Sequence, residues 1–267
     1  MSGKRTALSL QRTGFPYDMV LSEPLRLKPL SGIDALNAST ALLSDAIALG
    51  CFMICWFGYS QMAKLLTQRR ASLISTVKVF RERWMRRMCE RDNHIADAAL
   101  LSNLLRGALF FASTTVFILG GLLAVLGTGP KVAEVVSALP YVAHSEPWLM
   151  EVKATVLIIV FIYAFFKFTW SAWQYNVLSI LVGAAPAPET DKEEIHQFAR
   201  SAAQIASLAG ESYNNGIRAY YFSIALMAWF IHSLLFLAVT LIVALVMYRR
   251  EFASPMLQSL RAAVASK

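Results

Sequence analysis

Residues 219–248 read AYYFSIALMAWFIHSLLFLAVTLIVALVMY and contain no Asp, Glu, Lys or Arg. A helix needs roughly 20 predominantly apolar residues to cross the hydrocarbon core of a bilayer. A run of this length is longer than the buried helices of soluble proteins usually provide. The stretch therefore predicts one membrane-spanning helix over about residues 219–248.

Three other windows have the same character. Residues 46–63 and 107–130 carry no charged side chain, and residues 154–188 carry only Lys167. They predict spans over about residues 41–66, 102–126 and 151–182. The composition agrees, since 57% of the residues are apolar and only 16% are charged, which argues against a soluble helical protein. The predicted fold class is all-α: an integral membrane protein whose four helices occupy residues 41–254.

The flanking segments are different in kind. Residues 1–40 are polar and aperiodic, contain three prolines and lack the apolar core of a signal peptide, so they predict a mobile extension. Residues 255–267 form a tail. The net charge is +8, but the basic residues flank apolar segments, which indicates lipid headgroups and topology rather than nucleic acid. The three cysteines form no framework and predict no structural disulfide.

The segment between the first two spans, residues 67–92, predicts an amphipathic helix. Its apolar stripe consists of Leu73, Val77, Phe80, Trp84 and Met88. Its other sides carry Arg81, Arg83, Arg86 and Arg87, which with Trp84 are candidate contacts to anionic lipid headgroups. Such a helix is typical of one lying in the headgroup plane. An amphipathic helix packed on its own protein fits the pattern equally well, so both alternatives stay open.

A second soluble helix is expected over residues 192–210. Its stripe of Ile195, Ala199, Ala202, Ala206 and Ala209 indicates close helix packing. Asn214-Asn215-Gly216 follows and predicts a turn before the fourth span.

Basic residues set the expected orientation. Eight Lys or Arg residues lie between Arg69 and Arg91, whereas residues 127–150 contain only Lys131. Because positive residues near membrane ends favour the cytoplasm, the first loop is expected there. With four spans, both chain ends would then face outward.

Ionisable groups inside apolar windows are the first candidates for function, since burying them in lipid is costly. Lys167 and His232 lie in such windows, and Arg106 lies one turn inside the second span. Counting from the helix ends allows Lys167 and His232 to meet, as in a proton relay or an anion site. The alternative is that Lys167 extends to the interface and His232 bonds a neighbouring carbonyl.

A polar cluster precedes the second span. Its members are Asp92, Asn93, Asp97 and Asn103, and helix capping and ion pairing with Arg91 or Arg106 are its expected roles. No nucleophile or phosphate-binding motif accompanies it, so the sequence does not predict an enzyme. Only one histidine lies deep, which excludes a bis-histidine haem within one chain, and Cys51 and Cys55 fit packing better than metal binding. No cofactor or metal is expected.

Several stretches together resemble a known family. They are RDNHIAD (91–97), NLLR (103–106), FFASTT (110–115), ILGG (118–121), YN (175–176), ILVGAAP (180–186), NNGIRAYYF (214–222), WFIH (229–232) and YRREF (248–252). This pattern resembles the bacterial and plant membrane family catalogued as domain of unknown function 599, over about residues 43–254. His94 stands where the family pattern has Arg, and Ser233 where members often have Pro. The resemblance implies a four-helix membrane protein and implies no activity.

The expected function is a non-enzymatic protein of a bacterial inner membrane that acts through helix packing. It would be a homo-oligomer or an accessory subunit of a membrane complex, with the lipid bilayer, including anionic lipids, as its surroundings. Small residues at Gly120 and Gly121 motivate this expectation. The alternative is a small transporter or channel that acts as an oligomer, using Arg106, Lys167 and His232.

Overall fold

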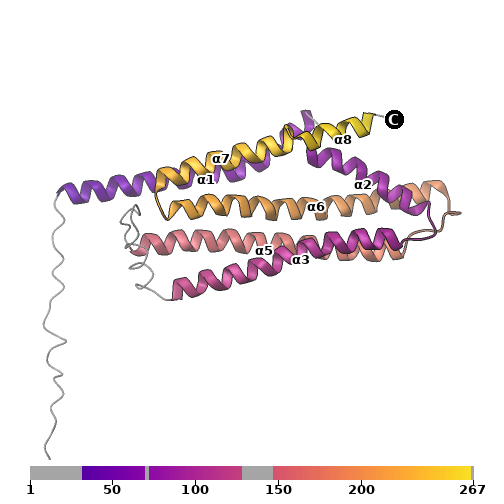
Figure 1. Cartoon of the computed structure of the whole chain (residues 1–267), viewed down its shortest axis with the longest axis horizontal. Coiled ribbons are helices and arrows are strands. Elements are labelled where there is room, and N and C mark those ends of the chain that lie inside the picture. Colours follow the sequence, from indigo (N-terminus) through magenta and orange to yellow (C-terminus); the bar gives the residue numbers. More distant parts are fainter. Residues whose placement is uncertain (1–31, 70–71, 128–146, 266–267) are drawn as a thin grey trace, which may run out of the picture. The chain divides into compact units, whose positions relative to one another are not determined.

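The computed structural model describes residues 32–69, 72–127 and 147–265, and all regular structure in these ranges is helical. The helices are α1 (Gly32–Arg69), α2 (Leu73–Cys89), α3 (Ile95–Gly127), α5 (Pro147–Gly183), α6 (Lys192–Trp229), α7 (Ser233–Phe252) and α8 (Pro255–Ala265) (Figure 1). The all-α class predicted from the sequence is confirmed.

The chain divides into two units at the boundary between Leu42 and Leu43, and each is described by itself. In the first unit the described residues belong to the start of α1, so residues 32–40 are helical although they were expected to be part of a polar extension. The expected extension over residues 1–31 lies outside the described residues. Everything below concerns the second unit.

Among the described residues, four helices are long and apolar enough to cross a membrane. The candidate spans are Leu42–Tyr59, Ile95–Gly127, Trp148–Gly183 and Ser233–Ala265. The predicted number of apolar spans is thus confirmed, and the first three lie where the sequence placed them. Most of the loop expected over residues 127–150 lies outside the described residues.

The fourth span begins later than predicted, because the run 219–248 is not one helix. α6 continues to Trp229, and α7 starts at Ser233 after a break. His232 makes the break: its backbone is extended (φ −161°, ψ 142°), and its Nδ1 accepts a hydrogen bond from Leu234 N at 3.1 Å. The Trp229 and Phe236 rings stack with centroids 5.1 Å apart across the turn. The prediction of a single helix here is wrong, since a capped hairpin replaces it.

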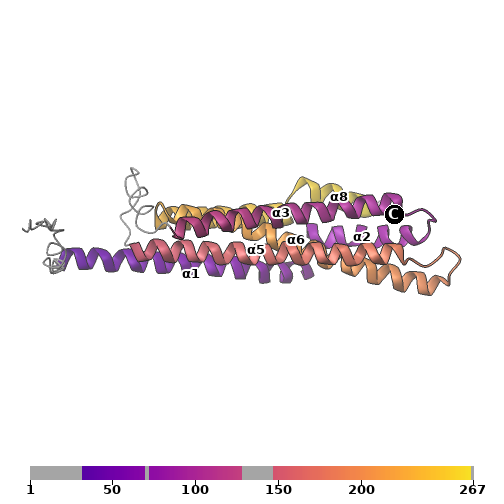
Figure 2. The same cartoon turned by 90° about the horizontal axis from the view of Figure 1, so that it is seen from below.

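The hairpin changes the path of the chain. Trp229 at the end of α6 contacts Asp45 in α1, whereas Glu251 at the end of α7 contacts Tyr59 in α1 and Arg218 in α6. α7 therefore runs parallel to α1, and α6 runs antiparallel to both, as the two perpendicular views agree (Figures 1 and 2). The second half of α6 thus lies alongside α1 and α7. As a result, α7 ends at the end of the bundle where α2 lies. The expected orientation of the chain ends relative to a membrane stays a prediction.

The predicted close packing of residues 192–210 is confirmed. The whole stripe of Ile195, Ala199, Ala202, Ala206 and Ala209 is buried in α6. The turn predicted at Asn214-Asn215-Gly216 is wrong, because these residues lie inside α6. Gly216 serves packing instead: a Cβ there would lie 2.7 Å from the Phe168 ring of α5.

Two buried clusters divide the bundle. The aromatic half lies between α1, α5, α6 and α7, and its buried residues include Phe52, Phe168, Phe222, Trp229 and Phe236. The alanine half lies where α2 and the starts of α3 and α6 meet the end of α5. It includes Met85, Met88, Leu101, Tyr175, Leu178 and the buried alanines of α6 from Ala199 to Ala209.

α2 packs against α6, and also contacts α7 and α8. Met85, Met88 and Cys89 of α2 are fully buried in the alanine half. Ser72 caps the start of α2 in a capping box with Ser75. Of the two alternatives drawn from the sequence, packing on the protein itself is therefore confirmed, and contact with lipid stays a prediction.

Candidate functional site

A buried ion pair lies at the end of the bundle where α6 turns into α7. The Nζ of Lys153 (α5) is 3.7 Å from Asp45 Oδ2 and donates a hydrogen bond to the carbonyl oxygen of Trp229 at 3.1 Å. Asp45 Oδ1 also accepts hydrogen bonds from Trp229 Nε1, at 2.8 Å, and from Ser233 Oγ. We call these four residues the Asp45 cluster.

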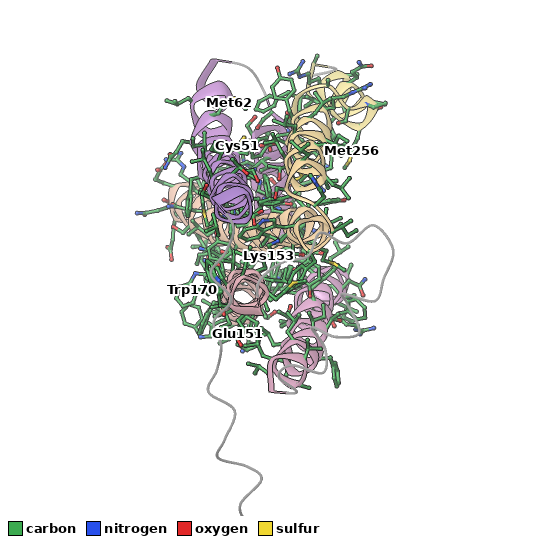
Figure 3. All side chains as sticks on the ribbon, turned by 90° about the vertical axis from the view of Figure 1, so that its left-hand side faces the viewer. Cys51, Met62, Glu151, Lys153, Trp170 and Met256 are labelled. Carbon is green, nitrogen blue, oxygen red and sulfur yellow. The ribbon has the colours of Figure 1, made fainter. Side chains whose placement is uncertain are left out.

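The Asp45 cluster joins four helices through two side chains that are almost fully buried. Lys153 is only 3% exposed and Asp45 only 6% exposed. In a view along the bundle, Lys153 lies inside, while Trp170 of the same helix lies at the outer edge (Figure 3). A buried charge is tolerated when it is paired and its remaining hydrogen bonds are made, as they are here. The cluster therefore fixes the ends of α1, α5, α6 and α7 relative to one another.

A second buried ion pair lies deeper toward the other end. Glu251 Oε2 (α7) accepts hydrogen bonds from Arg218 Nη2 (α6) at 2.9 Å and from the Tyr59 hydroxyl (α1) at 2.8 Å. The Arg218 guanidinium also stacks over the Tyr59 ring at 5.2 Å. Tyr59, Arg218 and Glu251 form the Glu251 cluster, which ties α1, α6 and α7 together.

Aromatic side chains fill the space between the two clusters. Asp45 and Tyr59 are fourteen residues apart in α1, which corresponds to about 21 Å along a helix. Between them Phe52 contacts the Phe222 and Phe236 rings at centroid distances of 5.7 and 5.4 Å. Each ion pair is thus internally matched, and the two are separated by a packed apolar core rather than joined by polar groups.

The structure does not bring Lys167 and His232 together. His232 is exposed and caps α7 beside the Asp45 cluster, whereas Lys167 lies fourteen residues beyond Lys153 in α5, about 21 Å farther along the bundle. The Lys167 Nζ lies 5.4 Å from the centre of the Tyr163 ring. Arg106 is exposed on α3. The relay that the sequence suggested therefore has no geometric basis within one chain.

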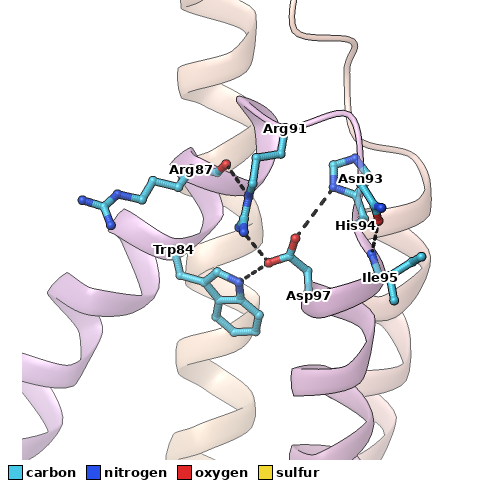
Figure 4. A network of polar contacts seen from close by, with 7 residues as sticks. All are labelled: Trp84, Arg87, Arg91, Asn93, His94, Ile95 and Asp97. Atoms are coloured by element: carbon cyan, nitrogen blue, oxygen red, sulfur yellow. Dashed lines mark hydrogen bonds and ion pairs between the residues drawn. The ribbon is translucent and has the colours of Figure 1, made fainter.

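The polar cluster before α3 is centred on Asp97, which is 1% exposed. Asp97 Oδ1 accepts hydrogen bonds from Trp84 Nε1 at 2.6 Å and from Arg91 Nη2 at 2.9 Å, and His94 Nδ1 lies 3.8 Å from Oδ2 (Figure 4). These contacts join the end of α2 to the start of α3. The ion pair expected between Asp97 and Arg91 is confirmed.

The other members of that predicted cluster have separate positions. The Asn93 side chain accepts a hydrogen bond from Ile95 N at 2.9 Å, which confirms its capping role. Asp92 and Asn103 are exposed and lie outside the network around Asp97. Capping and ion pairing thus account for the cluster's described contacts.

The predicted headgroup contacts on α2 divide into two groups. Arg86 and Arg87 are exposed, and Arg83 donates a long hydrogen bond of 3.5 Å to the carbonyl oxygen of Ala263 in α8. Arg81 points into the fold toward Gly210 of α6, where burial lowers the pKa of its guanidinium. Arg81 is therefore separated from the outward basic face to which the sequence assigned it.

Among the described residues, no group of three or more His, Cys, Asp or Glu side chains is placed to hold a metal ion. Cys51, Cys55 and Cys89 are free thiols, and burial raises the pKa of Cys89.

The outward face of α3 carries an unusual row of side chains. α3 packs against α5, and its buried residues include Leu101, Ala108, Ala112 and Thr115. The opposite side has an exposed row, the α3 stripe, made of Ser102, Arg106, Leu109, Ser113, Val116, Gly120 and Ala124. No other atom comes within 4 Å of where a Cβ on Gly120 or Gly121 would lie.

The family model for "Protein of unknown function, DUF599" matches residues 47–256 of this chain. The chain belongs to this family. No curated protein and no solved structure matches it. In this DUF599 protein the matched segment includes the whole Glu251 cluster and every residue of the Asp45 cluster except Asp45 itself, which lies two residues before it.

Sequence reasoning about this DUF599 protein overlooked both ion-pair clusters. Lys153, Arg218 and Glu251 lie within a turn of apolar windows, where an ionisable group is a warning of a buried pair. Their partners could not be named, because the paired residues are separated by up to 192 positions in the sequence.

Proposed function

We propose that this DUF599 protein is a non-enzymatic, multi-pass protein of a bacterial inner membrane that forms a homo-oligomer through the α3 stripe. The observation that carries the proposal is the exposure of a row of small and polar side chains on the outer face of a candidate span. α2 and α8 would lie on the cytoplasmic side, since α2 carries the concentrated basic residues.

The composition of the α3 stripe supports helix association over simple contact with lipid. Helices in membranes associate through small residues that allow close backbone approach and through polar side chains that bond across the interface. Gly120 and Ala124 provide a pair of small residues one turn apart, and Ser113 adds a hydroxyl two turns earlier. Lipid-facing surfaces need none of these features.

A second copy is the partner that this stripe fits. In a parallel pair related by a twofold axis along the membrane normal, Gly120 and Ala124 meet the same residues of the other copy, so both backbones approach closely. Arg106 lies fourteen residues from Gly120, about 21 Å toward the basic end, where its long side chain reaches lipid phosphates instead of its counterpart.

Cysteine cross-linking in native membranes tests this proposal. In a background lacking Cys51, Cys55 and Cys89, Ser113→Cys should give a disulfide-linked dimer on oxidation. Ile159→Cys, on the exposed face of α5, should give little. Gly120→Leu should shift the purified protein toward monomer in gentle detergent, because the larger side chain separates the helices.

Gly50→Leu is the matched control for that shift. Gly50 is an exposed glycine of α1, and no other atom comes within 4 Å of where a Cβ on it would lie, so the same change there adds the same bulk elsewhere. A monomeric wild-type mass in native membrane extracts, or Ser113→Cys cross-links only to other proteins, would contradict self-association.

Transport through a single chain has less support. The aromatic core separates the Asp45 and Glu251 clusters, and the described residues between them offer no continuous row of polar groups. We therefore do not assign a solute path to one copy.

A further inference from the structure

A cavity of about 180 Å³ lies where the start of α2 meets the α7–α8 junction. Its polar lining comes from three helices: Arg81 of α2, Asn214 and Arg218 of α6, and Arg250 and Glu251 of α7. Apolar side chains of α2 and α8, including Val77 and Met256, complete the wall. The cavity borders the Glu251 cluster but extends beyond it.

The charge on this lining is unbalanced. Three guanidinium groups face the cavity and only one carboxylate does, and Glu251 already binds Arg218 and the Tyr59 hydroxyl through its Oε2. Within the described ranges no carboxylate lies within ion-pair distance of Arg81 or Arg250. The Arg250 guanidinium rests over the Tyr221 ring at 5.4 Å, which leaves its donors for another group.

Arg81 is held against the protein rather than in solvent. Its guanidinium occupies the space that a Cβ on Gly210 would need, so the missing side chain of Gly210 makes room for it. The surroundings lower the pKa of Arg81 because they desolvate it. Burying a charged group without a partner is costly, and an anion in the cavity would offset that cost.

We propose that this cavity binds a phosphoryl group through Arg81, Arg218 and Arg250, with the Asn214 amide as an additional donor. Guanidinium groups present paired donors in a fork that matches phosphate oxygens. The surplus of two positive charges on the lining suits an anion of one or two negative charges. The volume of this cavity accommodates a phosphate and part of what it is attached to.

The cavity's position selects a phospholipid headgroup as the main source of that phosphoryl group. Arg250 lies in the last turn of α7, at the basic end of the bundle, where lipid phosphates would lie if α7 crosses a membrane. The apolar wall formed by Val77 and Met256 suits the glycerol and upper acyl region of a lipid more than a free ion. Free phosphate shares the same chemistry and is distinguished by experiment.

Native mass spectrometry of the purified full chain in neutral detergent tests the site. Phosphatidylglycerol is titrated against wild type, and monoglucosyl diacylglycerol serves as the phosphate-free lipid. The wild type should retain phosphatidylglycerol and not the glucolipid. Arg81→Gln and Arg250→Gln should each weaken retention roughly tenfold, as expected for the loss of one hydrogen-bonded charge. Arg250→Lys should restore part of it, because the charge remains and the fork is lost.

Arg249→Gln and Arg200→Gln are the matched controls. Both residues are exposed, one beside Arg250 and one on α6, and neither lines the cavity. The retention of phosphatidylglycerol by these two variants should differ from that of the wild type by less than twofold. Equal losses in the controls and the cavity variants would overturn the proposal, since general surface charge would then explain binding. Thermal unfolding of each variant verifies that it is folded. If Arg81→Gln does not fold, the result for Arg250→Gln decides the test.

Inorganic phosphate alone forms the second arm. Free phosphate that raises the unfolding midpoint of wild type but not of Arg250→Gln, with no retention of phosphatidylglycerol, would identify the free ion as the ligand. Retention of the lipid without such a rise would identify the headgroup. If neither probe distinguishes wild type from Arg250→Gln, the cavity binds no phosphoryl group.

Discussion

The aromatic half and the alanine half share the helices α5 and α6, but they exclude solvent with opposite kinds of side chain. In the aromatic half, large rings such as Phe52 and Phe222 fill wide gaps between helices, and two ion-pair clusters lie buried at its ends. In the alanine half, Ala202, Ala206 and Ala209 bring α6 close to its neighbours. Apart from the Asp97 network and Arg81, the charges of the described residues there lie on exposed surfaces.

The difference matches what drives helices together in each medium. Where lipid surrounds a helix, apolar burial gives little net gain, so buried polar bonds and shape hold the bundle. Where water surrounds it, an apolar stripe is sufficient. The comparison therefore predicts that removing charge disrupts the aromatic half, while adding bulk disrupts the alanine half.

The largest expected effect concerns which side of the membrane each half occupies. In a background without native cysteines, Ser201→Cys in α6 and Ser259→Cys in α8 should be labelled from the same side, and Ile231→Cys at the hairpin from the opposite side. A membrane-impermeant maleimide applied to oriented vesicles measures this. The result is all or none, because α6 and α7 both pass through the bundle.

Labelling of Ser201→Cys and Ser259→Cys from opposite sides would mean that residues 219–248 cross once. The hairpin, and with it the shared role of α6 in both halves, would then be wrong. Ser259 and Ser201 are both exposed, so access does not limit the comparison.

The next largest effect follows from breaking the Glu251 cluster. Glu251→Leu leaves Arg218 buried without its partner, and we expect the free energy of unfolding to fall by about 3–5 kcal/mol. Denaturant titration in mixed micelles measures it.

The double change Arg218→Met with Glu251→Leu is the control. It separates the cost of losing the ion pair from the cost of leaving Arg218 buried without a partner. Replacing a whole buried pair by apolar side chains is often close to neutral, so the double variant should recover most of the lost stability. Equal losses in the single and double variants would show that the pair contributes net attraction, and that charge is not merely tolerated in the aromatic half. Glu194→Leu, an exposed change on α6, should stay within about 0.5 kcal/mol.

A smaller effect is expected from added bulk in the alanine half. Ala206 is 1% exposed, and Ala206→Leu should destabilise the protein by about 1–3 kcal/mol because the extra methyl groups force the helices apart. The same titration measures this change. Gln204→Leu places the same side chain on the exposed face of α6 and should alter stability by no more than about 0.5 kcal/mol. Similar losses in both variants would mean that α6 is not closely packed there.

The smallest effect is expected at Lys167, which lies on the periphery of the aromatic half. Lys167→Met should change the free energy of unfolding by less than about 0.5 kcal/mol, since no described carboxylate pairs with Lys167. A loss comparable to that of Glu251→Leu would reveal a buried role for this lysine and weaken the division into two ion-pair clusters.

Apolar runs were sufficient to predict the all-α class and three of the four spans, because length and charge alone decide whether a helix can cross lipid. They failed for residues 219–248, since a hairpin between two apolar helices leaves the composition unchanged. The break between α6 and α7 contains neither Gly nor Pro, and α7 is capped by the imidazole of His232. The sequence therefore lacks the residues that usually indicate the end of one helix and the start of the next. At Gly216 the error is the opposite, since a turn is predicted where the helix continues. Asn214 and Asn215 make the sequence resemble a turn, whereas Gly216 allows close contact with Phe168.

How well the contacts of the candidate sites could be predicted depended on the separation of their residues in the sequence. The Asp97 network joins residues 6 and 13 positions apart, and the pairing of Asp97 with Arg91 could be predicted. Asp45 and Trp229 are separated by 184 positions, so only the fold brings them together. Lys167 and His232 are candidates because they lie within apolar windows. A position in such a window does not show how deep the residue lies in the bundle when, as at His232, the helix breaks inside the window.

The α6–α7 hairpin also bears on how the chain enters the membrane. The deep half of α6 carries Arg218 and is not among the candidate spans, so alone it would leave the translocon poorly, at a cost of about 2.5–3.5 kcal/mol for a central arginine. Glu251, which neutralises that charge, is synthesised 33 residues later at the end of α7. We therefore expect α6 and α7 to partition into lipid together, as one unit. A nascent chain that ends before Glu251 should leave α6 at the membrane surface.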